Sequence, residues 1–358
     1  MLSPQCQLLE RNLGIFDEGE WVFINPTDAY FTDALKHRPL TVLHQYFDMF
    51  SESVRVVPSY TLDSRDVESG GLRCEQKVGH HQHVFTPFET RHQCATDVLV
   101  FLPKAKAHFS MNLRMAAGML KPGGRIHVVG ENKGGIKSAA KLMQQYGATQ
   151  KVDSARHCSL ITTQVEDTHA AFEPSAWLET HTFEADTTEW DVVTMPGVFS
   201  HGELDPGSRL LLEKHYDGMR GSVLDFACGA GVIGSYLMKR YPHLTLEMLD
   251  VSAIALYCCA LTLAENQQVA RLIAANGLYG VDTRVDHIIT NPPFHSGIKT
   301  DYTITKRFIA DAKRVLNTGG RLQMVANRFL PYPGLLSEHF TRVHTVAQTS
   351  QFSVYMTA

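Results

Sequence analysis

The sequence predicts an α/β protein of two tandem units, each a mostly parallel β-sheet covered by helices. Its length of 358 residues exceeds what a single hydrophobic core usually encloses, so two domains are expected. In the C-terminal half, short apolar runs alternate with amphipathic helical segments, a pattern typical of parallel sheets. The N-terminal half contains an imperfect copy of that order, which indicates a duplicated unit.

The elements of the C-terminal half are predicted from their apolar periodicity. Strands are expected at residues 223–226, 245–249, 271–274, 287–290 and 321–326. Helices are expected at 233–241 and 253–265, where apolar residues recur at helical spacing. The last two runs, 343–348 and 352–356, are close enough in the sequence to form an antiparallel hairpin. Together these elements predict a seven-stranded, mostly parallel sheet.

The duplication rests on two pairs of matching segments. Residues 97–104 and 286–293 each begin with Asp, continue as an apolar strand and reach a proline. Residues 120–129 and 316–325 each contain a Gly-Gly turn that leads into a strand. Chance similarity is the alternative, because Gly-Gly turns before strands are common.

The N-terminal copy is expected to be catalytically empty. No glycine-rich loop follows its first predicted strand at 21–24, and Leu102-Pro103-Lys104 stands where the other copy has Asn291-Pro292-Pro293. We therefore predict a degenerate copy of the active domain at 1–165, a polar linker at 166–189 and the active domain at 190–358.

Bulk composition restricts the class of protein. The formal net charge is −4, so no global positive field attracts nucleic acid; if RNA is the substrate, local basic patches must bind it. The seven cysteines contain no Cys-x-x-Cys pair, and their odd number argues against a complete disulfide framework. We recognise neither a signal peptide nor an apolar stretch long enough to cross a bilayer, so a cytoplasmic protein without a membrane partner is expected.

A glycine-rich segment marks the expected cofactor site. The strand ending at Phe226 runs into Gly229-x-Gly231-x-x-Gly234 and then a helix, so backbone and helix N-terminus can approach a ligand closely. These glycines also match the dinucleotide fingerprint, with Asp250 about the expected distance away. However, Asp225 inside the strand suits the cationic amino-acid part of S-adenosylmethionine better than a pyrophosphate. We therefore expect S-adenosylmethionine as the cofactor.

Further cofactor contacts are expected at the ends of the neighbouring strands. Asp250 can accept both ribose hydroxyls of an adenosine, or it can be the N-cap of the helix after Ser252. Asn276 can bind the adenine edge, or it can simply form an Asn-Gly turn. Cys228 is expected to pack against the cofactor, because nothing nearby supplies a base to make it a nucleophile. The cofactor-binding candidates are Asp225, Cys228, Gly229, Gly231, Asp250, Val251 and Asn276.

The segment Asn291-Pro292-Pro293-Phe294 indicates the reaction. It follows a strand at the carboxyl edge of the predicted sheet, where ligands of open α/β folds bind. The Asn291 side-chain oxygen and the Pro292 carbonyl can each accept one hydrogen from a planar exocyclic NH2 group, and Phe294 can stack on a base. A rigid strand exit with a buried Phe294 is the alternative, but it leaves the glycine motif unexplained. The catalytic candidates are Asn291, Pro292 and Phe294, acting on an unpaired or flipped base.

Several basic residues are candidates for contacts with RNA phosphates. They are Lys133, Lys137, Lys299, Arg307 and Arg328, with a solvated helix face as the alternative for the first two. The run His80-His81-x-His83 has poor spacing for a tetrahedral metal site, so we interpret it as a solvated loop and expect no metal.

These motifs resemble those of the two-domain ribosomal RNA guanine-N2 methyltransferases over most of the chain. The matching segments are 132–135, 152–156, 195–200, 204–208, 225–231, 291–295 and 325–333. The resemblance implies two tandem Rossmann-like class I methyltransferase domains, of which the first lacks cofactor and assists RNA binding and folding of the second. It also implies a guanine of 16S RNA in the 30S subunit as substrate; we expect a monomer. One departure is Phe226-Ala227, where the family often has Val-Gly, so backbone freedom is lower there.

Three other functions stay open at this point. A sister enzyme that methylates guanine in 23S RNA shares the Asn-Pro-Pro-Phe-His core. A protein glutamine also presents a planar NH2 group, although glutamine methyltransferases usually have Tyr after the prolines and give the N-terminal copy no role. The third alternative is a non-catalytic RNA-binding or assembly factor that retains the fold.

Overall fold

The computed structural model describes residues 2–55, 57–67, 70–199, 202–292 and 302–358. Two of the predicted site residues, Phe294 and Lys299, therefore lie outside the described residues. The chain divides into two compact units: unit 1 contains Met1–Val57 and Arg73–Leu178, and unit 2 contains Pro58–Leu72 and Glu179–Ala358.

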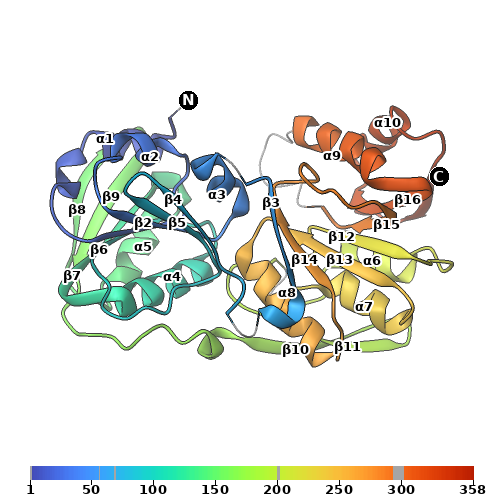
Figure 1. Cartoon of the computed structure of the whole chain (residues 1–358), viewed down its shortest axis with the longest axis horizontal. Helices are drawn as coiled ribbons and strands as arrows, with labels where there is room; N and C mark the ends of the chain where they lie inside the picture. The colour runs from blue at the N-terminus through green and yellow to red at the C-terminus, as the bar shows by residue number, and fades with distance from the viewer. Residues whose placement is uncertain (1, 56, 68–69, 200–201, 293–301) are drawn as a thin grey trace. The chain divides into compact units, whose positions relative to one another are not determined.

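Unit 1 is an eight-stranded sheet in the order β4-β5-β2-β1-β6-β7-β9-β8 (Figure 1). The strands are β1 (Trp21–Ile24), β2 (Leu40–His44), β4 (Cys74–Val78), β5 (His81–Phe85), β6 (Ala95–Phe101), β7 (Leu120–Glu131), β8 (Thr149–Ala155) and β9 (Cys158–Gln164). The helices are α1 (Pro4–Glu10), α2 (Tyr30–Ala34), α3 (Phe47–Val54), α4 (Lys106–Met119) and α5 (Ile136–Met143). The five central strands from β5 to β7 run parallel, whereas β4, β9 and β8 pair antiparallel.

Unit 2 has a second eight-stranded sheet, in the order β17-β18-β16-β15-β12-β13-β14-β3. The strands are β3 (Ser59–Asp63), β12 (Ser222–Phe226), β13 (Thr245–Asp250), β14 (Arg271–Ala275), β15 (Val285–Thr290), β16 (Leu316–Asn327), β17 (Val343–Gln348) and β18 (Phe352–Thr357). The helices are α6 (Pro206–Glu213), α7 (Val232–Arg240), α8 (Ala253–Glu265), α9 (Tyr302–Val315) and α10 (Tyr332–Ser337). A separate antiparallel hairpin is formed by β10 (Glu179–Ala185) and β11 (Thr188–Thr194).

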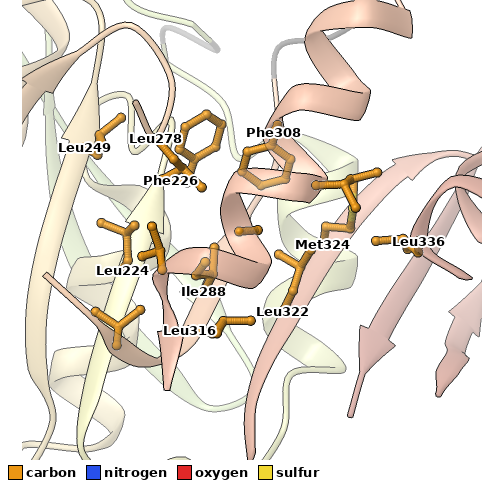
Figure 2. Close-up of a cluster of buried hydrophobic side chains, with 14 of the residues drawn as sticks. Leu224, Phe226, Leu249, Leu278, Ile288, Phe308, Leu316, Leu322, Met324 and Leu336 are labelled. Carbon is orange, nitrogen blue, oxygen red and sulfur yellow. The ribbon is translucent and has the colours of Figure 1, made fainter. Parts of the chain in front are cut away.

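The sheet of unit 2 is buried on both faces, which explains why its central strands are almost continuously apolar. On one face, α9 and α10 cover the sheet, and α7 and α8 lie on the other (Figure 1). Figure 2 shows Phe308 of α9 and Leu336 of α10 in the same cluster as Phe226 and Met324 of the strands, and the rings of Phe226 and Phe308 are 4.4 Å apart. This packing fixes the strand ends that carry the candidate site.

The predicted elements of the C-terminal half are confirmed, with bounds that differ by at most five residues. All five predicted strands exist, the helix at Ala253–Glu265 matches α8, and the last two runs pair antiparallel. Seven strands were expected in this sheet, but it has an eighth. The additional strand β3 comes from the N-terminal half and pairs antiparallel with β14, with Asp63 opposite Arg271 and Ser59 opposite Ala275. It covers the backbone groups of what is otherwise an edge strand.

The division of the chain also differs from the expected boundaries. Residues 58–72, expected in the N-terminal domain, belong to unit 2 because they contain β3. The expected linker at 166–189 is not a single connecting segment. Its first part, up to Leu178, belongs to unit 1, where Phe172 is buried, and its last part forms β10 and the start of β11 in unit 2.

Candidate functional site

The glycine-rich loop connects β12 to α7 at the carboxyl edge of the sheet. Three of its residues have positive φ: Ala227 at 58°, Gly229 at 54° and Gly231 at 80°. A Cβ on Gly231 would lie 2.9 Å from Sγ of Cys259, so a side chain there would meet both backbone strain and a close contact. Ala227 adopts the left-handed conformation, which a residue with a Cβ rarely adopts. The loop therefore carries strain at this residue.

Asp225 is the central buried acid of this loop. Its Oδ2 accepts a hydrogen bond from the backbone N–H of Gly234 at 2.8 Å. Its Oδ1 is buried and has no hydrogen-bond partner among the described residues. Burial raises the pKa of Asp225 to about 8, and the neighbouring charge of Asp250 adds to this increase. A buried oxygen without a donor fits the cationic amino-acid part of S-adenosylmethionine.

Asp250 joins the end of β13 to the glycine-rich loop. Its Oδ2 accepts from the N–H of Gly229 and its Oδ1 from the N–H of Ser252, both at 2.9 Å. The N-cap of α8 is Ser252 itself, whose hydroxyl accepts from Ala255 N, so the interpretation of Asp250 as the cap is wrong. Burial raises the pKa of Asp250. Each oxygen keeps lone-pair capacity for one ribose hydroxyl.

The other cofactor candidates lie in or after the neighbouring strands and in the loop itself. Val251 is half-buried directly after Asp250, and Asn276 is exposed at the end of β14, where Gly277 has a φ of 75°. Burial raises the pKa of the Cys228 thiol well above its usual value, and Cys259 contributes to the shift. The thiol is therefore protonated at neutral pH and is packed beside the loop, not activated as a nucleophile.

Asn291 lies at the end of β15, next to the glycine-rich loop. Strands β15 and β12 are parallel neighbours, and Thr290 Oγ1 donates to the Phe226 carbonyl at 2.7 Å, which ties the two strand ends together. The side-chain Nδ2 of Asn291 donates to Asp205 Oδ2 at 2.8 Å and to Ser208 Oγ at 2.9 Å. Pro292 follows and is buried. The structure thus brings the candidate residues for amine capture and for cofactor binding to one edge of one sheet.

Asp205 and Ser208 are contact residues that sequence reasoning did not select as site residues. They form the start of α6, where Asp205 is the N-cap and accepts from Ser208 N. The Asp-Pro pair at the start of a helix is a recognisable capping signal. Nothing local in the sequence indicates that this cap also holds Asn291, more than 80 residues away.

The basic candidates occur in both units. Lys133 and Lys137 are exposed on unit 1, at Asn132–Gly134 and on α5. In unit 2, Arg328 is exposed directly after β16, and the Arg307 guanidinium lies 5.2 Å from the ring centre of Tyr279 and 3.8 Å from Asp311. All four side chains are exposed, and that of Arg307 also has Asp311 and Tyr279 as neighbours.

The histidine run is not a solvated loop. His81 and His83 lie on β5 and are buried, and His83 Nδ1 is 3.0 Å from Nε2 of His44. Burial lowers the pKa of His83 to about 4, so its ring is neutral at physiological pH. Within the described ranges, no group of three or more His, Cys, Asp or Glu side chains is arranged to hold a metal ion. Nor does this part of the chain contain a helix that is long and apolar enough to span a membrane.

Two family models match most of the chain. Residues 189–356 match the methyltransferase small domain, and residues 71–181 match its N-terminal domain. The chain is 67% identical over 355 residues to the ribosomal RNA small subunit methyltransferase C of Alteromonas mediterranea, with 99% of both chains covered. It is 39% identical over 356 residues to the protein of that name in Pseudoalteromonas atlantica, again with 99% coverage of both.

The fold has a solved counterpart. A T. thermophilus 16S rRNA N2 G1207 methyltransferase, in complex with AdoMet and guanosine, superposes with a TM-score of 0.80 at 22% identity, covering 99% of this chain and 91% of that chain. This similarity shows that the two-domain methyltransferase architecture is shared. Given the identity over its whole length to named relatives, the chain belongs to the ribosomal RNA small subunit methyltransferase C family.

Proposed function

We propose that this protein transfers a methyl group from S-adenosylmethionine to the exocyclic N2 amine of a guanine in 16S rRNA. The names of its relatives and the ligands of the T. thermophilus structure support this substrate and cofactor. The observation that carries the proposal is the adjacency of two strand ends: β12 leads into the loop of Asp225, and β15 leads into Asn291. Adjacent strands are about 4.8 Å apart, so a nitrogen held at one end is close to a ligand at the other.

The cofactor supplies an electrophilic methyl group on its sulfonium. In our proposal Asp225 offers its unpartnered oxygen to the cationic part of the cofactor, and Asp250 accepts the ribose hydroxyls. The remaining contacts come from Cys228, Gly229, Gly231, Val251 and Asn276.

Catalysis in this scheme requires positioning of the amine. Asn291 Oδ1 and the Pro292 carbonyl each accept one N–H of the guanine amine, which directs the nitrogen lone pair at the methyl group. Phe294 stacks on the base. No strong general base is needed, because the nitrogen becomes acidic as the new bond forms and its proton then leaves to water.

RNA binding is proposed to use exposed cations and aromatic rings beside this edge. Arg328 is followed by Phe329, which is 81% exposed, and Arg307 stacks with Tyr279, which is 60% exposed. Guanidinium groups suit phosphates, and exposed rings suit unpaired bases. In unit 1, Lys133 and Lys137 are the proposed phosphate contacts. We further propose that the protein is a cytoplasmic monomer and that the RNA is presented within the 30S particle.

The decisive experiment is transfer of tritium from labelled S-adenosylmethionine. The acceptors are 30S particles, free 16S rRNA, 23S rRNA, ribosomal protein, and a 16S transcript in which inosine, which lacks the N2 amine, replaces guanosine. We expect label in 16S RNA, more in 30S particles than in free RNA, and none in the inosine transcript. Label in 23S rRNA or protein favours the corresponding alternative, and the absence of any transfer favours an assembly factor.

A variant tests the amine-capture role directly. Asn291→Ala should lower the transfer rate by at least about 100-fold, because an acceptor that positions the nitrogen is lost. Cofactor affinity should stay within about twofold. The matched control is Asn317→Ala, which also removes an Asn–Asp hydrogen bond of unit 2 but near the start of β16. A normal rate for Asn291→Ala would refute the assignment.

A further inference from the structure

The start of α6 holds the side-chain amide of Asn291 in one orientation. Both hydrogens of its NH2 group have partners: Asp205 Oδ2 at 2.8 Å and Ser208 Oγ at 2.9 Å. The carboxylate of Asp205 can only accept hydrogen bonds. Rotating the amide by 180° would bring Asn291 Oδ1 against that carboxylate and replace attraction by repulsion between two acceptors. The chemistry of the partner therefore determines which end of the amide faces α6.

The same contact determines what the amide offers on its other side. With both N–H groups turned toward α6, Oδ1 is the group left to face a ligand. An exocyclic amine is a hydrogen-bond donor, so it requires an oxygen there, whereas a flipped amide would present N–H to N–H. A donor held by an anionic acceptor also polarises the amide and strengthens its oxygen as an acceptor.

Local packing keeps the Asp205 carboxylate in place. Its Oδ2 also accepts from the backbone N–H of Ser208 at 2.9 Å, so the helix cap and the contact with Asn291 share one oxygen. Ser208 is buried. A Cβ on Gly207 would lie 3.0 Å from Asp205 Oδ2 and 3.2 Å from the Phe352 ring, so the glycine leaves just enough room for the carboxylate.

We infer that Asp205 and Ser208 are positioning residues that set the orientation of the Asn291 amide and thereby make it selective for an amine. The inference rests on the proposed function of Asn291. Neither residue touches the substrate in this scheme. They act through Asn291, by excluding the orientation that cannot accept a hydrogen bond from the base.

Single substitutions separate this role from helix capping. Asp205→Asn keeps a good N-cap, because Asn and Asp cap helices equally well, but its side chain can offer either an oxygen or an NH2 group to Asn291. We expect kcat to fall by about 10- to 100-fold, with KM for RNA and cofactor affinity changed less than about threefold. Ser208→Ala removes one of two partners and should lower kcat less. The control is Ser3→Ala, which removes the cap of α1 in unit 1.

A double substitution tests the positioning role through recovery of activity, which would not occur if Asp205 only stabilised the helix. Asn291→Asp alone brings two carboxylates to within hydrogen-bond distance and should remove nearly all activity. Adding Asp205→Asn restores a donor and acceptor pair, since the new amide can hold one carboxylate oxygen and leave the other to accept from the base. We expect the double variant to be at least about tenfold more active than Asn291→Asp.

The outcomes are distinct. Wild-type activity for Asp205→Asn, or no rescue in a double variant that is folded and binds the cofactor, overturns the positioning role while the proposed function stands. Absence of transfer by the wild-type protein to any 16S acceptor refutes the proposed function itself. Thermal unfolding and cofactor titration of each variant identify those that fail to fold, and Ser208→Ala and the exchange pair then decide the question.

Discussion

The two units of this chain have the same strand order, but different side chains occupy the carboxyl edge of their sheets. Unit 2 has two acids there, and unit 1 has a network of neutral polar side chains. In each sheet, five parallel strands are followed at one end by an antiparallel pair. At the other end, an additional antiparallel strand pairs with the outermost parallel strand: β4 with β5 in unit 1, and β3 with β14 in unit 2. Strands β7 and β16 are each 12 residues long and start with the same Gly-Gly turn pattern. The duplication expected from the sequence is therefore visible in the topology.

The strand registers show which residues correspond. Ile24 pairs with Val100 of β6 as Asp225 pairs with Ile289 of β15, so a buried isoleucine occupies the position of the buried acid. One strand further, Gln45 follows β2 where Asp250 ends β13. The pair of acids that suits a cofactor is thus missing from unit 1.

In unit 1 a polar network fills this place. The buried Gln45 side chain accepts from Asn25 Nδ2 at 2.7 Å and donates to the Pro87 carbonyl and to Asn112 Oδ1. His108 Nε2 lies 2.8 Å from Gln45 Oε1. In this part of the described chain, the polar side chains are hydrogen-bonded to one another. The comparison indicates that two sheets of the same topology can differ in the few residues at the carboxyl edge, which is where we propose that cofactor binding is decided.

The largest effect on stability is expected at Asp225, because its carboxyl group is buried, whereas unit 1 has the uncharged Ile24 at the equivalent position. The pKa of this carboxyl is about 8 in the folded protein, against its ordinary value of 3.8 in the unfolded chain. Below about pH 4 the group is neutral in both states, and the folded protein loses stability as the pH rises toward 8, because the unfolded chain ionises first. Asp225→Asn should therefore be more stable than wild type at pH 9, by on the order of 5 kcal/mol, with little difference near pH 4. Denaturant unfolding at both pH values, with hydrogen exchange of β12, measures this. Equal pH slopes for the two proteins would contradict it.

The second test places the residue of unit 1 into unit 2. Asp250→Gln removes a charged acceptor from the Gly229 amide and from the ribose, a loss of about 1.5–3 kcal/mol per hydrogen bond to a charged group. Cofactor affinity should fall by about 10- to 100-fold in calorimetric titration. Asp286→Asn, which alters a carboxylate that accepts from the Ser222 amide near the start of β15, should leave cofactor affinity unchanged. Unchanged affinity in Asp250→Gln would remove Asp250 from the cofactor site.

The third test is the reverse exchange in unit 1. Gln45→Asp shortens the side chain and puts a charge among partners arranged for an amide, so about 2 kcal/mol of stability should be lost. Titration should still show a single cofactor site per chain, because the Ile24 position provides no second acid. A second binding site would show that unit 1 is closer to a functional pocket than its network indicates.

The smallest effect is expected in the loop itself. Ala227 has a φ of 58°, a conformation that glycine adopts without strain. Ala227→Gly should raise the free energy of unfolding by about 0.5–1 kcal/mol, since relief of strain exceeds the added flexibility of the unfolded chain. Thermal unfolding measures this, and cofactor affinity should be unchanged or slightly higher. A lower melting temperature would mean that packing of the Ala227 methyl group outweighs its strain.

The local sequence alone determined the five parallel strands of unit 2 and its C-terminal hairpin, the glycine-rich loop after β12 and the position of Asn291 at the end of β15. Each of these follows from a pattern within about ten residues: an apolar run, a glycine spacing, or a proline after a strand. The residues proposed to contact a cofactor or a base lie at the ends of these strands, where the carboxyl edge of a parallel sheet brings them together.

Only the tertiary structure decided which distant segments complete the active unit. The pairing of β3 with β14 joins segments some 200 residues apart, and the cap of α6 reaches Asn291 across more than 80. The same holds for the burial of His81 and His83, whose polar sequence suggested solvent exposure. Such contacts depend on which strand edge is left open and which partner can accept a hydrogen bond, and no local pattern records either.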